Sequence, residues 1–391
     1  MPSAAIRNAD VDVAVVGAGP AGARTAAQLA ARGLRVLILE RDPEPGRPVH
    51  CTGIVSSECV ERFALPRSLV LHEIDSFVLH SPKGASAQVK RSSTQAYVLD
   101  RVGLDKHLVR RAEEAGAEAL AGAAVSGIAW TGGGVRVEGT LGGEPLRVEA
   151  RAAVAATGFG APLARRLGLG EAREVLSGCQ VVAEAEGLSQ VEVYSGGAHG
   201  RGGFGWLVPY RPGYALVGVL TRSPAVRYMR EHVRRLQGAG RIGTVVETFR
   251  CRPVSLGVAG RSVADGVLGV GDVVNQVKPT TGGGIYYGLL GADAAAETLT
   301  EALERGRADA AALQPYEARW RGLMASEIRH GYRLRRLLEG LPDAGVEQMH
   351  RLLRLPGLQR AAASIAAPFD WHSGPLLRLV DRLQRYAEPA A

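Results

Sequence analysis

The sequence predicts a mixed α/β (α+β) fold, in which a domain built on a parallel sheet carries an inserted antiparallel sheet and is followed by helices. Three observations lead to this prediction. Residues 11–40 show strand, helix and strand patterns in succession. Residues 68–97 and 176–254 contain alternating apolar segments that are typical of antiparallel strands. From about residue 301 onward, the apolar spacing becomes that of helices.

Length and composition place the chain among ordinary globular proteins. It has 391 residues, of which 46% are hydrophobic and 22% charged, and this excludes the disordered, collagen-like and disulfide-scaffold classes. The N-terminus lacks the apolar stretch of a signal peptide, and no run of about 18 apolar residues occurs. We therefore expect a cytoplasmic protein that is either free or bound peripherally to a membrane.

The formal charge of +8 comes almost entirely from arginine. These arginines are spread along the chain among acidic residues, whereas a nucleic-acid-binding protein gathers its basic residues in clusters. The charge thus favours weak attraction to an anionic membrane over nucleic-acid binding. The four cysteines form no C-x-x-C pair and the nine histidines show no metal-ligand spacing, which predicts a reducing compartment and no metal site.

The first βαβ unit carries a dinucleotide-binding motif of the Rossmann type, G-x-G-x-x-G. Gly17 permits the tight turn after the strand, Gly19 lets the backbone approach a pyrophosphate, and Gly22 lets the helix pack closely on the strand. The phosphates would lie on free N–H groups at the start of the helix. Glu40 ends the second strand at the spacing that hydrogen-bonds a ribose diol.

A second glycine-rich segment lies far downstream. A short apolar strand ends at Gly271-Asp272 and is followed by Lys278-Pro-Thr-Thr-Gly-Gly-Gly-Ile285 and an alanine-rich helix. An acid at a strand end, followed by a glycine-rich turn into a helix, can bind a ribityl chain and present N–H groups to a flavin ring. The two ends of the chain together therefore predict FAD as the cofactor, although the first motif alone does not separate FAD from NAD.

In these motifs the chain resembles the geranylgeranyl reductases, which belong to the FAD-dependent flavoproteins related to p-hydroxybenzoate hydroxylase. The resemblance covers about residues 11–335. It rests on five blocks in the family's order, which are GAGPAGA at 17–23, PVHCTG at 48–53, YVLDRVGLDKHL at 97–108, GFGWLVP at 203–209 and GDVVNQVKPTTGGGI at 271–285.

The resemblance implies roles for individual residues. Arg101 would contact FAD, Glu40 the adenosine ribose and Asp272 the ribityl chain, although Arg101 also fits a surface charge that caps a helix. The full set of implied FAD-binding residues is Gly17, Gly19, Gly22, Ala23, Glu40, Arg41, Cys51, Thr52, Arg101, Ala124, Asp272, Gly283, Gly284 and Ile285. The implied catalytic residues are Cys51, Phe204 and Trp206.

One stretch departs from the family pattern. Where relatives carry Ala-Asp-Gly and then a serine, this chain has Thr157 and Ala161 in place of the Asp and the Ser. In related hydroxylases this segment touches both FAD and the nicotinamide, and a second βαβ motif for NAD(P)H is absent from the sequence. The electron donor is therefore left open between NAD(P)H in transient contact and a ferredoxin-like protein.

These patterns predict a discontinuous domain organisation. The FAD-binding domain takes residues 1–60, 98–175 and 255–300, and the antiparallel-sheet substrate domain takes 61–97 and 176–254. Residues 301–391 form a C-terminal helical region. Its leucines at 334, 337, 338 and 341 follow helical spacing, and we expect them to face the core or form a lid in preference to anchoring a membrane.

The GFGWLVP block predicts the substrate slot. Alternation places Phe204, Trp206 and Val208 on one face of a strand, where they would form an apolar wall if that face meets the flavin and a core stripe if it does not. An isoprenoid suits such a slot, because each buried methylene contributes about 0.8 kcal/mol. His199 and Arg201 are candidates for the substrate's head group, although both also fit a solvated loop.

Cys51 is the predicted proton donor. An ordinary thiol is mostly protonated at neutral pH, so Cys51 could protonate one alkene carbon as hydride from the flavin reaches the other. The alternative is a small buried apolar residue at a tight turn beside Gly53.

Three functions stay open on this evidence. The first is an FAD-dependent oxidoreductase that reduces isoprenoid double bonds of a polyprenyl lipid, diphosphate or quinone. The second is an FAD-dependent monooxygenase or halogenase, because the block around Trp206 also resembles the halogenase W-x-W-x-I-P pattern. A halogenase needs a catalytic lysine, and the candidates Lys83 and Lys90 lie at a predicted hairpin. The third is a non-catalytic FAD-binding protein.

Overall fold

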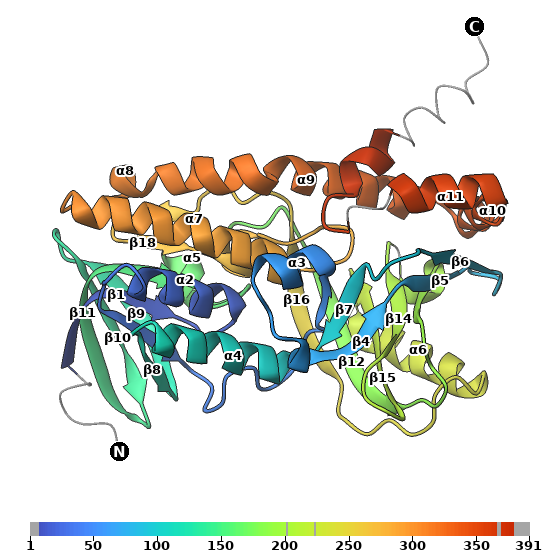
Figure 1. Cartoon of the computed structure of the whole chain (residues 1–391), viewed down its shortest axis with the longest axis horizontal. Helices are drawn as coiled ribbons and strands as arrows, with labels where there is room; N and C mark the ends of the chain where they lie inside the picture. The colour runs from blue at the N-terminus through green and yellow to red at the C-terminus, as the bar shows by residue number, and fades with distance from the viewer. Residues whose placement is uncertain (1–7, 201, 223, 366–368, 379–391) are drawn as a thin grey trace, which may run out of the picture.

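Two sheets and a layer of helices make up the chain. The computed structural model describes residues 8–378 except 201, 223 and 366–368 (Figure 1). The mainly parallel sheet lies at one end of the molecule and the antiparallel sheet at the other, while α7 and α9 run side by side across the top of the view. This mixed architecture confirms the predicted fold class.

The first sheet is mainly parallel and follows the order β17-β18-β11-β1-β2-β8, with β10 and β9 added beside β11. Its central strands pair in parallel, as the βαβ pattern predicts. They are buried on both faces by helices and by the β9–β10 ribbon. The strands are β1 (Asn8–Val16), β2 (Val36–Glu40), β8 (Glu118–Ala121), β9 (Ala123–Trp130), β10 (Val135–Leu141), β11 (Glu144–Ala155), β17 (Val263–Ala264) and β18 (Val267–Gly269).

Helix α2 (Pro20–Ala30) links β1 to β2 and begins with proline in its first turn, where no N–H is needed. Its small buried residues let it pack closely against α4 (Arg101–Glu114) and α7 (Ile285–Glu304). The Asp100 side chain caps α4 by accepting bonds from two backbone N–H groups. This packing places the starts of α2, α4 and α7 at one edge of the sheet.

The second sheet has seven strands in the order β16-β12-β15-β14-β13-β5-β6. All neighbours are antiparallel except β13 and β5. Helix α6 (Ala225–Gly238) covers one face, with Met229, Val233 and Leu236 turned inward. The strands are β5 (Ser76–His80), β6 (Ser86–Lys90), β12 (Glu174–Glu184), β13 (Val191–Ser195), β14 (Phe204–Pro209), β15 (Tyr214–Thr221) and β16 (Arg250–Leu256).

A small third sheet, in the order β3-β7-β4, joins the two larger ones. It consists of β3 (Ile54–Ser56), β4 (Val70–Ile74) and β7 (Ala96–Leu99), with α3 (Ser57–Arg62) after β3. The short helices are α5 (Pro162–Arg166), α8 (Ala310–Leu313) and the 3-10 turns η1 (Arg67–Leu69), η2 (Gly197–His199) and η3 (Gly271–Val274). The predicted domain boundaries stay a prediction, and residues 1–7 and 379–391 of those ranges lie outside the described residues.

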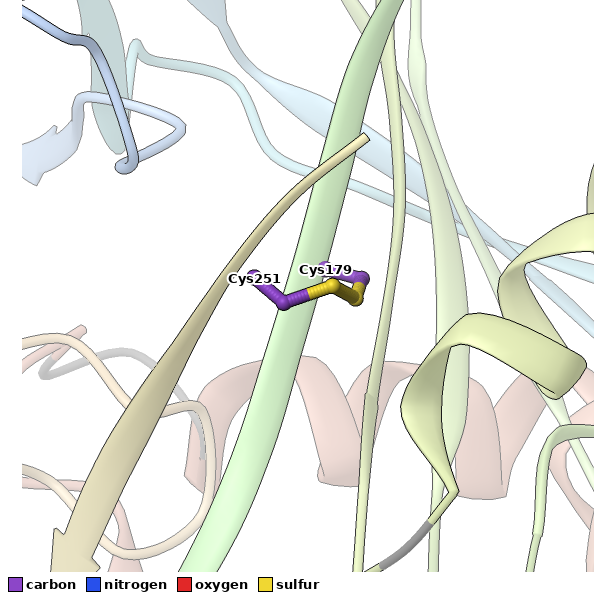
Figure 2. The surroundings of a disulfide bond; sticks show 2 residues. All are labelled: Cys179 and Cys251. Carbon is purple, nitrogen blue, oxygen red and sulfur yellow. A yellow bond between two sulfur atoms is a disulfide. The ribbon is translucent and has the colours of Figure 1, made fainter. Parts of the chain in front are cut away.

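Two cysteines form a disulfide, which differs from the expectation of reduced thiols. Figure 2 shows Cys179 on β12 joined to Cys251 on β16. The two residues are register partners on adjacent antiparallel strands, with their Cα atoms 4.1 Å apart. Because they are 72 residues apart in sequence, only the strand pairing could reveal their contact. Cys51 and Cys59 are free.

The C-terminal helices form as predicted, but most of the leucines on their predicted apolar stripe are exposed. Helices α9 (Pro315–Gly340), α10 (Asp343–Leu353) and α11 (Pro356–Ile365) follow α8. Leu334 is buried as expected, but Leu337, Leu338 and Leu341 are exposed, so they do not face the core, and the alternative of a lid stays a prediction. They lie at the end of α9, where the helix extends beyond the core that buries its first part. Within the described residues, no helix is both long and apolar enough to cross a bilayer.

Candidate active site

A cavity of about 720 Å³ lies where the two large sheets meet. One wall comes from the ends of β1 and β2, the loop after β11 and the start of α7. The opposite wall comes from β12, β14, β15 and β16 of the antiparallel sheet. Its volume lies within the range that is typical of ligand and cofactor sites.

The glycines of the first motif meet three different surroundings. A Cβ on Gly17 would lie 2.4 Å from the Ala156 carbonyl oxygen, and its φ of +110° disfavours other residues. A Cβ on Gly22 would lie 2.0 Å from the Gly17 oxygen, so Gly22 allows the close packing of helix on strand. A Cβ on Gly19 would meet nothing within 4 Å, because Gly19 borders the cavity. The open space at Gly19 fits the approach of a pyrophosphate.

Glu40 and Arg41 line the same end of the cavity. The Glu40 carboxylate accepts hydrogen bonds from the N–H groups of Ala18 (2.7 Å) and Asp42 (2.8 Å). These bonds hold the acid beside the glycine turn, where the spacing predicted a ribose contact. Ala23 and Ala124 do not line the cavity: Ala23 is buried, and its N–H bonds to the Gly19 carbonyl oxygen.

Arg101, at the start of α4, points into the cavity with only 11% of its side chain exposed. One Nη lies 2.9 Å from Asp105, one turn further along the helix. Burial alone would lower the pKa of Arg101, but its interactions with Asp105 and Cys51 raise it overall. Its Nε and the other Nη have no hydrogen-bond partner among the described residues. Two buried, unsatisfied donors beside the cavity fit a polar cofactor better than a surface helix cap.

Asp272 lies at the start of η3 and also lines the cavity. Its side chain is exposed to the cavity, and the protein packed around it raises its pKa to about 6 by partial desolvation. A Cβ on Gly284 would lie 2.6 Å from an Asp272 oxygen, so glycine is needed for this approach. Gly284 and Ile285 line the cavity, whereas Gly283 lies just outside it against the Lys278 side chain.

Cys51 and Thr52 line the cavity from the loop before β3. The Cys51 Sγ accepts a bond of 3.4 Å from the Gly53 N–H and also interacts with the Arg101 guanidinium. Gly53 has a φ of +75°, and a Cβ there would lie 2.5 Å from the Leu99 oxygen. The glycine thus allows the tight turn that brings the thiol to Arg101.

Trp206 alone of the three predicted slot residues lines the cavity. Its ring covers Gly218 of β15, where a Cβ would lie 2.2 Å from the ring. Phe204 packs beside it, with ring centroids 5.8 Å apart, in a cluster with Leu220, Val254 and Tyr332. Val208 is fully buried in another cluster. Trp206 is therefore the only one of the three that contacts the cavity, and Phe204 supports it from the apolar cluster behind.

Other predicted residues lie elsewhere. His199 is buried on the opposite face of the sheet, where its Nε2 lies 3.1 Å from His232 Nδ1, so the predicted head-group role of His199 is wrong. Arg201 lies outside the described residues. Lys83 lies in the β5–β6 turn and Lys90 ends β6. None of the described residues that line the cavity is a lysine.

Several residues of the cavity were not predicted from the sequence. Leu220 and Val254 complete its apolar wall, and Gln180 adds a buried side-chain oxygen that has no partner among the described residues. A glutamine in the otherwise apolar strand Cys179-Gln180-Val181 is a signal that could have found this one. His50 lies 2.9 Å from Arg252, and burial followed by the charges of Arg252 and Arg250 lowers its pKa to about 4. No pattern in the sequence could predict the contact between His50 and Arg252, because the two residues lie far apart in the chain.

Comparisons with known proteins agree with this geometry. The FAD binding domain family matches residues 10–328. Digeranylgeranylglycerophospholipid reductase 2 of Methanothermobacter thermautotrophicus is 32% identical over 363 residues, which cover 88% of this chain and 91% of that protein. Digeranylgeranylglycerophospholipid reductase 1 of Methanopyrus kandleri is 32% identical over 384 residues, which cover 89% and 98%.

Solved structures show the same fold. A geranylgeranyl bacteriochlorophyll reductase-like protein of Thermoplasma acidophilum superposes with a TM-score of 0.84 at 23% identity and covers 96% of this chain and 99% of that one. A flavin-dependent brominase superposes less closely, with a TM-score of 0.69 at 16% identity over 97% and 100% of the two chains. The motif, the fitted cavity and these relatives together establish FAD as the cofactor. The chain belongs to the geranylgeranyl reductase family of FAD-dependent oxidoreductases.

Proposed function

We propose that this protein reduces carbon–carbon double bonds in the isoprenoid chain of a polyprenyl lipid, diphosphate or quinone. The observation that carries the proposal is the placement of Cys51 beside Arg101 in a cavity that also has the apolar wall of Trp206, Leu220 and Val254. The names of the two archaeal relatives, both digeranylgeranylglycerophospholipid reductases, support the same substrate class.

The apolar wall favours a hydrocarbon chain over a polar substrate. Each buried methylene contributes about 0.8 kcal/mol, so a ten-carbon segment gains on the order of 8 kcal/mol without a polar clamp. The unpartnered Gln180 oxygen and the Trp206 indole nitrogen, which also lacks a partner among the described residues, provide polar contacts for a head group. A few placed polar groups in an apolar pocket are what fix a ligand's orientation.

The reaction needs one hydride and one proton for each double bond. Reduced FAD, when bound, supplies the hydride and is oxidised. Cys51 gives the proton to the second alkene carbon from its Sγ, so that C=C becomes CH–CH and a thiolate is left. Without such a donor, a charged carbon centre would form in an apolar pocket at high cost.

The surroundings of Cys51 suit this role. The Gly53 N–H donates to Sγ, and the nearby Arg101 guanidinium would stabilise the thiolate after proton transfer. Arg101 is held in place by Asp105, so it acts here as a positioning residue for the thiol. Solvent then returns the proton before the next turnover.

The electron donor in this proposal is NAD(P)H in transient contact or a ferredoxin-like protein. Thr157 and Ala161, which stand in place of the family's Asp and Ser, line the cavity near the glycine turn. Neither side chain is charged, so this segment does not by itself favour one of the two electron donors.

The monooxygenase and halogenase alternatives receive less support. Fold neighbours include a flavin-dependent brominase, but the predicted catalytic lysines Lys83 and Lys90 lie on a hairpin of the antiparallel sheet and do not line the cavity. A non-catalytic FAD-binding protein would have no need of a thiol held against a guanidinium in the cofactor cavity.

One experiment tests the proposal. The FAD-loaded protein is photoreduced without oxygen and then mixed with a panel of prenyl lipids, diphosphates and quinones, while flavin absorbance and product masses are followed. We expect reoxidation that depends on the prenyl substrate and products heavier by one or more pairs of hydrogens. Reoxidation only on admission of oxygen, with a long-lived hydroperoxide absorbance band, would instead identify an oxygenase.

A further inference from the structure

The end of the C-terminal helical layer exposes six large apolar side chains. They are Leu337, Leu338, Leu341, Leu352, Leu355 and Leu358, here called the leucine face, and each has an exposed fraction between 38% and 52%. Figure 1 shows α10 and α11 together beside the end of α9, at the end of the molecule that holds β5 and β6. Exposed apolar residues gathered in this way mark an interaction surface.

Arginines outnumber exposed acids around the leucine face. Arg333, Arg336, Arg351 and Arg354 are exposed on the same helices. The acids of residues 337–358 are Glu339, Asp343 and Glu347, of which the side chains of Glu339 and Glu347 are buried and Asp343 is exposed.

Hydrogen bonds show where these acids point. Asp343 accepts a bond of 2.8 Å from the Gly197 N–H, and Glu347 one of 2.5 Å from the Lys83 N–H. Glu339, whose side chain is 8% exposed, lies 2.9 Å from Arg335. The outer surface of this segment therefore presents mainly leucines and arginines, with Asp343 as its exposed acid. Apolar and basic side chains together are the pattern of helices that lie in the interface of an anionic membrane.

The leucine face also adjoins the apolar support of the cavity. Tyr332 of α9 packs in the cluster of Phe204, Trp206, Leu220 and Val254, and Leu337 lies five residues further along the same helix. At about 1.5 Å per residue, only about 8 Å of helix axis separates them. The leucine face thus begins close to the end of the cavity's apolar support, with the Arg335–Glu339 ion pair between them.

We propose that the leucine face docks the protein on an anionic lipid membrane, with the six leucines inserted among the acyl chains and the arginines against the headgroups. The inference rests on the proposed function for its choice of a membrane over a protein partner, because an isoprenoid lipid substrate resides there. The arginines supply attraction to anionic lipid, and the leucines supply insertion that remains at high salt.

Co-sedimentation of the FAD-loaded full chain with vesicles tests this docking. The vesicles are phosphatidylcholine alone or equal parts of phosphatidylcholine and phosphatidylglycerol. We expect binding to the anionic vesicles, at least a tenfold loss in the triple variant Leu352→Gln/Leu355→Gln/Leu358→Gln, and about a tenfold loss in Arg351→Gln/Arg354→Gln on anionic vesicles only. The FAD absorbance of each variant reports that it has folded.

A matched control removes as many exposed apolar residues elsewhere. The variant Val226→Gln/Val246→Gln/Leu323→Gln changes residues with exposed fractions of 40%, 47% and 49% and should bind vesicles like the parent. Equal vesicle binding by the leucine-face variant and this control would overturn the proposal. So would a parent protein that ignores vesicles but dimerises, or binds an acidic partner protein, through the leucine face.

The outcome separates this proposal from the proposed function. Vesicle binding requires no turnover, so a protein that docks but reduces no prenyl substrate leaves the leucine face supported and the proposed reaction wrong. Conversely, turnover of detergent-dispersed prenyl substrate by a protein that never binds vesicles overturns only the docking.

Discussion

The two walls of the cavity use different residue types for different purposes. The nucleotide-binding wall consists of glycines and charged side chains whose positions are set by backbone contacts, such as Gly17 against Ala156 and Glu40 against the Ala18 N–H. The antiparallel wall consists of Trp206, Leu220 and Val254, which are held by side-chain packing. A backbone cradle tolerates almost no change, whereas a packed apolar wall tolerates changes that keep its volume. The first wall therefore serves one cofactor, and the second can vary with the substrate.

The largest expected effect comes from filling the open space at Gly19. Gly19→Val should abolish FAD binding, with at least a hundredfold rise in Kd, because the new side chain occupies the pyrophosphate's approach. Since a Cβ there meets no protein atom within 4 Å, the unfolding temperature of the FAD-free protein should stay the same. Flavin titration and thermal melts measure the two effects.

Gly260→Val is the matched control, because a Cβ at Gly260 also meets nothing within 4 Å and this loop residue does not line the cavity. It should bind FAD like the parent. Stoichiometric FAD in Gly19→Val would show that the cofactor does not approach this turn. The nucleotide-binding wall would then tolerate change as the apolar wall does.

The next effect concerns the thiol between the walls. Cys51→Ala should keep FAD but slow substrate-dependent reoxidation of the reduced flavin by roughly ten- to a thousandfold, with Cys51→Ser intermediate, because general acids contribute about this much. Single-turnover stopped-flow absorbance measures the rate. Cys59→Ala, which removes the other free thiol, should react at the parent rate. A parent-like rate in Cys51→Ala would assign the proton to water or another group.

A smaller effect is expected on the apolar wall. Trp206→Ala should raise the KM for prenyl substrates by about ten- to a hundredfold, because a large aromatic ring against the substrate contributes a few kcal/mol of contact. The oxidised flavin spectrum should hardly change. Trp130→Ala, at a partly exposed tryptophan of the other sheet, is the control. Unaltered turnover and products in Trp206→Ala would make this residue part of the core alone.

The smallest effect is a pH dependence built into the antiparallel sheet. Burial lowers the pKa of His199 from 6.5 to about 4, and burial with the neighbouring His199 lowers that of His232 to about 3. The unfolded chain therefore binds more protons than the folded one as pH falls from about 6.5 to about 4, and stability is lost over that window. We expect the unfolding temperature to drop by about 5 °C between pH 7 and pH 5.

Replacing the pair should flatten this slope. His199→Gln/His232→Gln should show a lower unfolding temperature at pH 7 but a weaker dependence on pH, whereas His72→Gln, at a histidine that bonds the Ser189 carbonyl, should keep the parent slope. Equal slopes in the double variant and the parent would place the pH dependence in other groups.

The nucleotide-binding half could be predicted from sequence because its chemistry depends on local backbone geometry. Gly17, Gly19, Gly22 and Glu40 lie within one βαβ unit, so their spacing alone predicts the turn, the close packing and the acid at the strand end. Asp272 and Gly284 belong to a similar local unit. The same reasoning predicted the helices of the C-terminal region and their apolar spacing.

Tertiary structure decided what these segments meet. Alternation put Phe204, Trp206 and Val208 on one face, but only the packing of β15 and α9 placed Trp206 alone at the cavity. The Cys179–Cys251 pair depends on the register between β12 and β16. Helical spacing also could not tell whether the leucines after Leu334 face the core or solvent, because a periodic pattern fixes which residues share a face and not what covers that face.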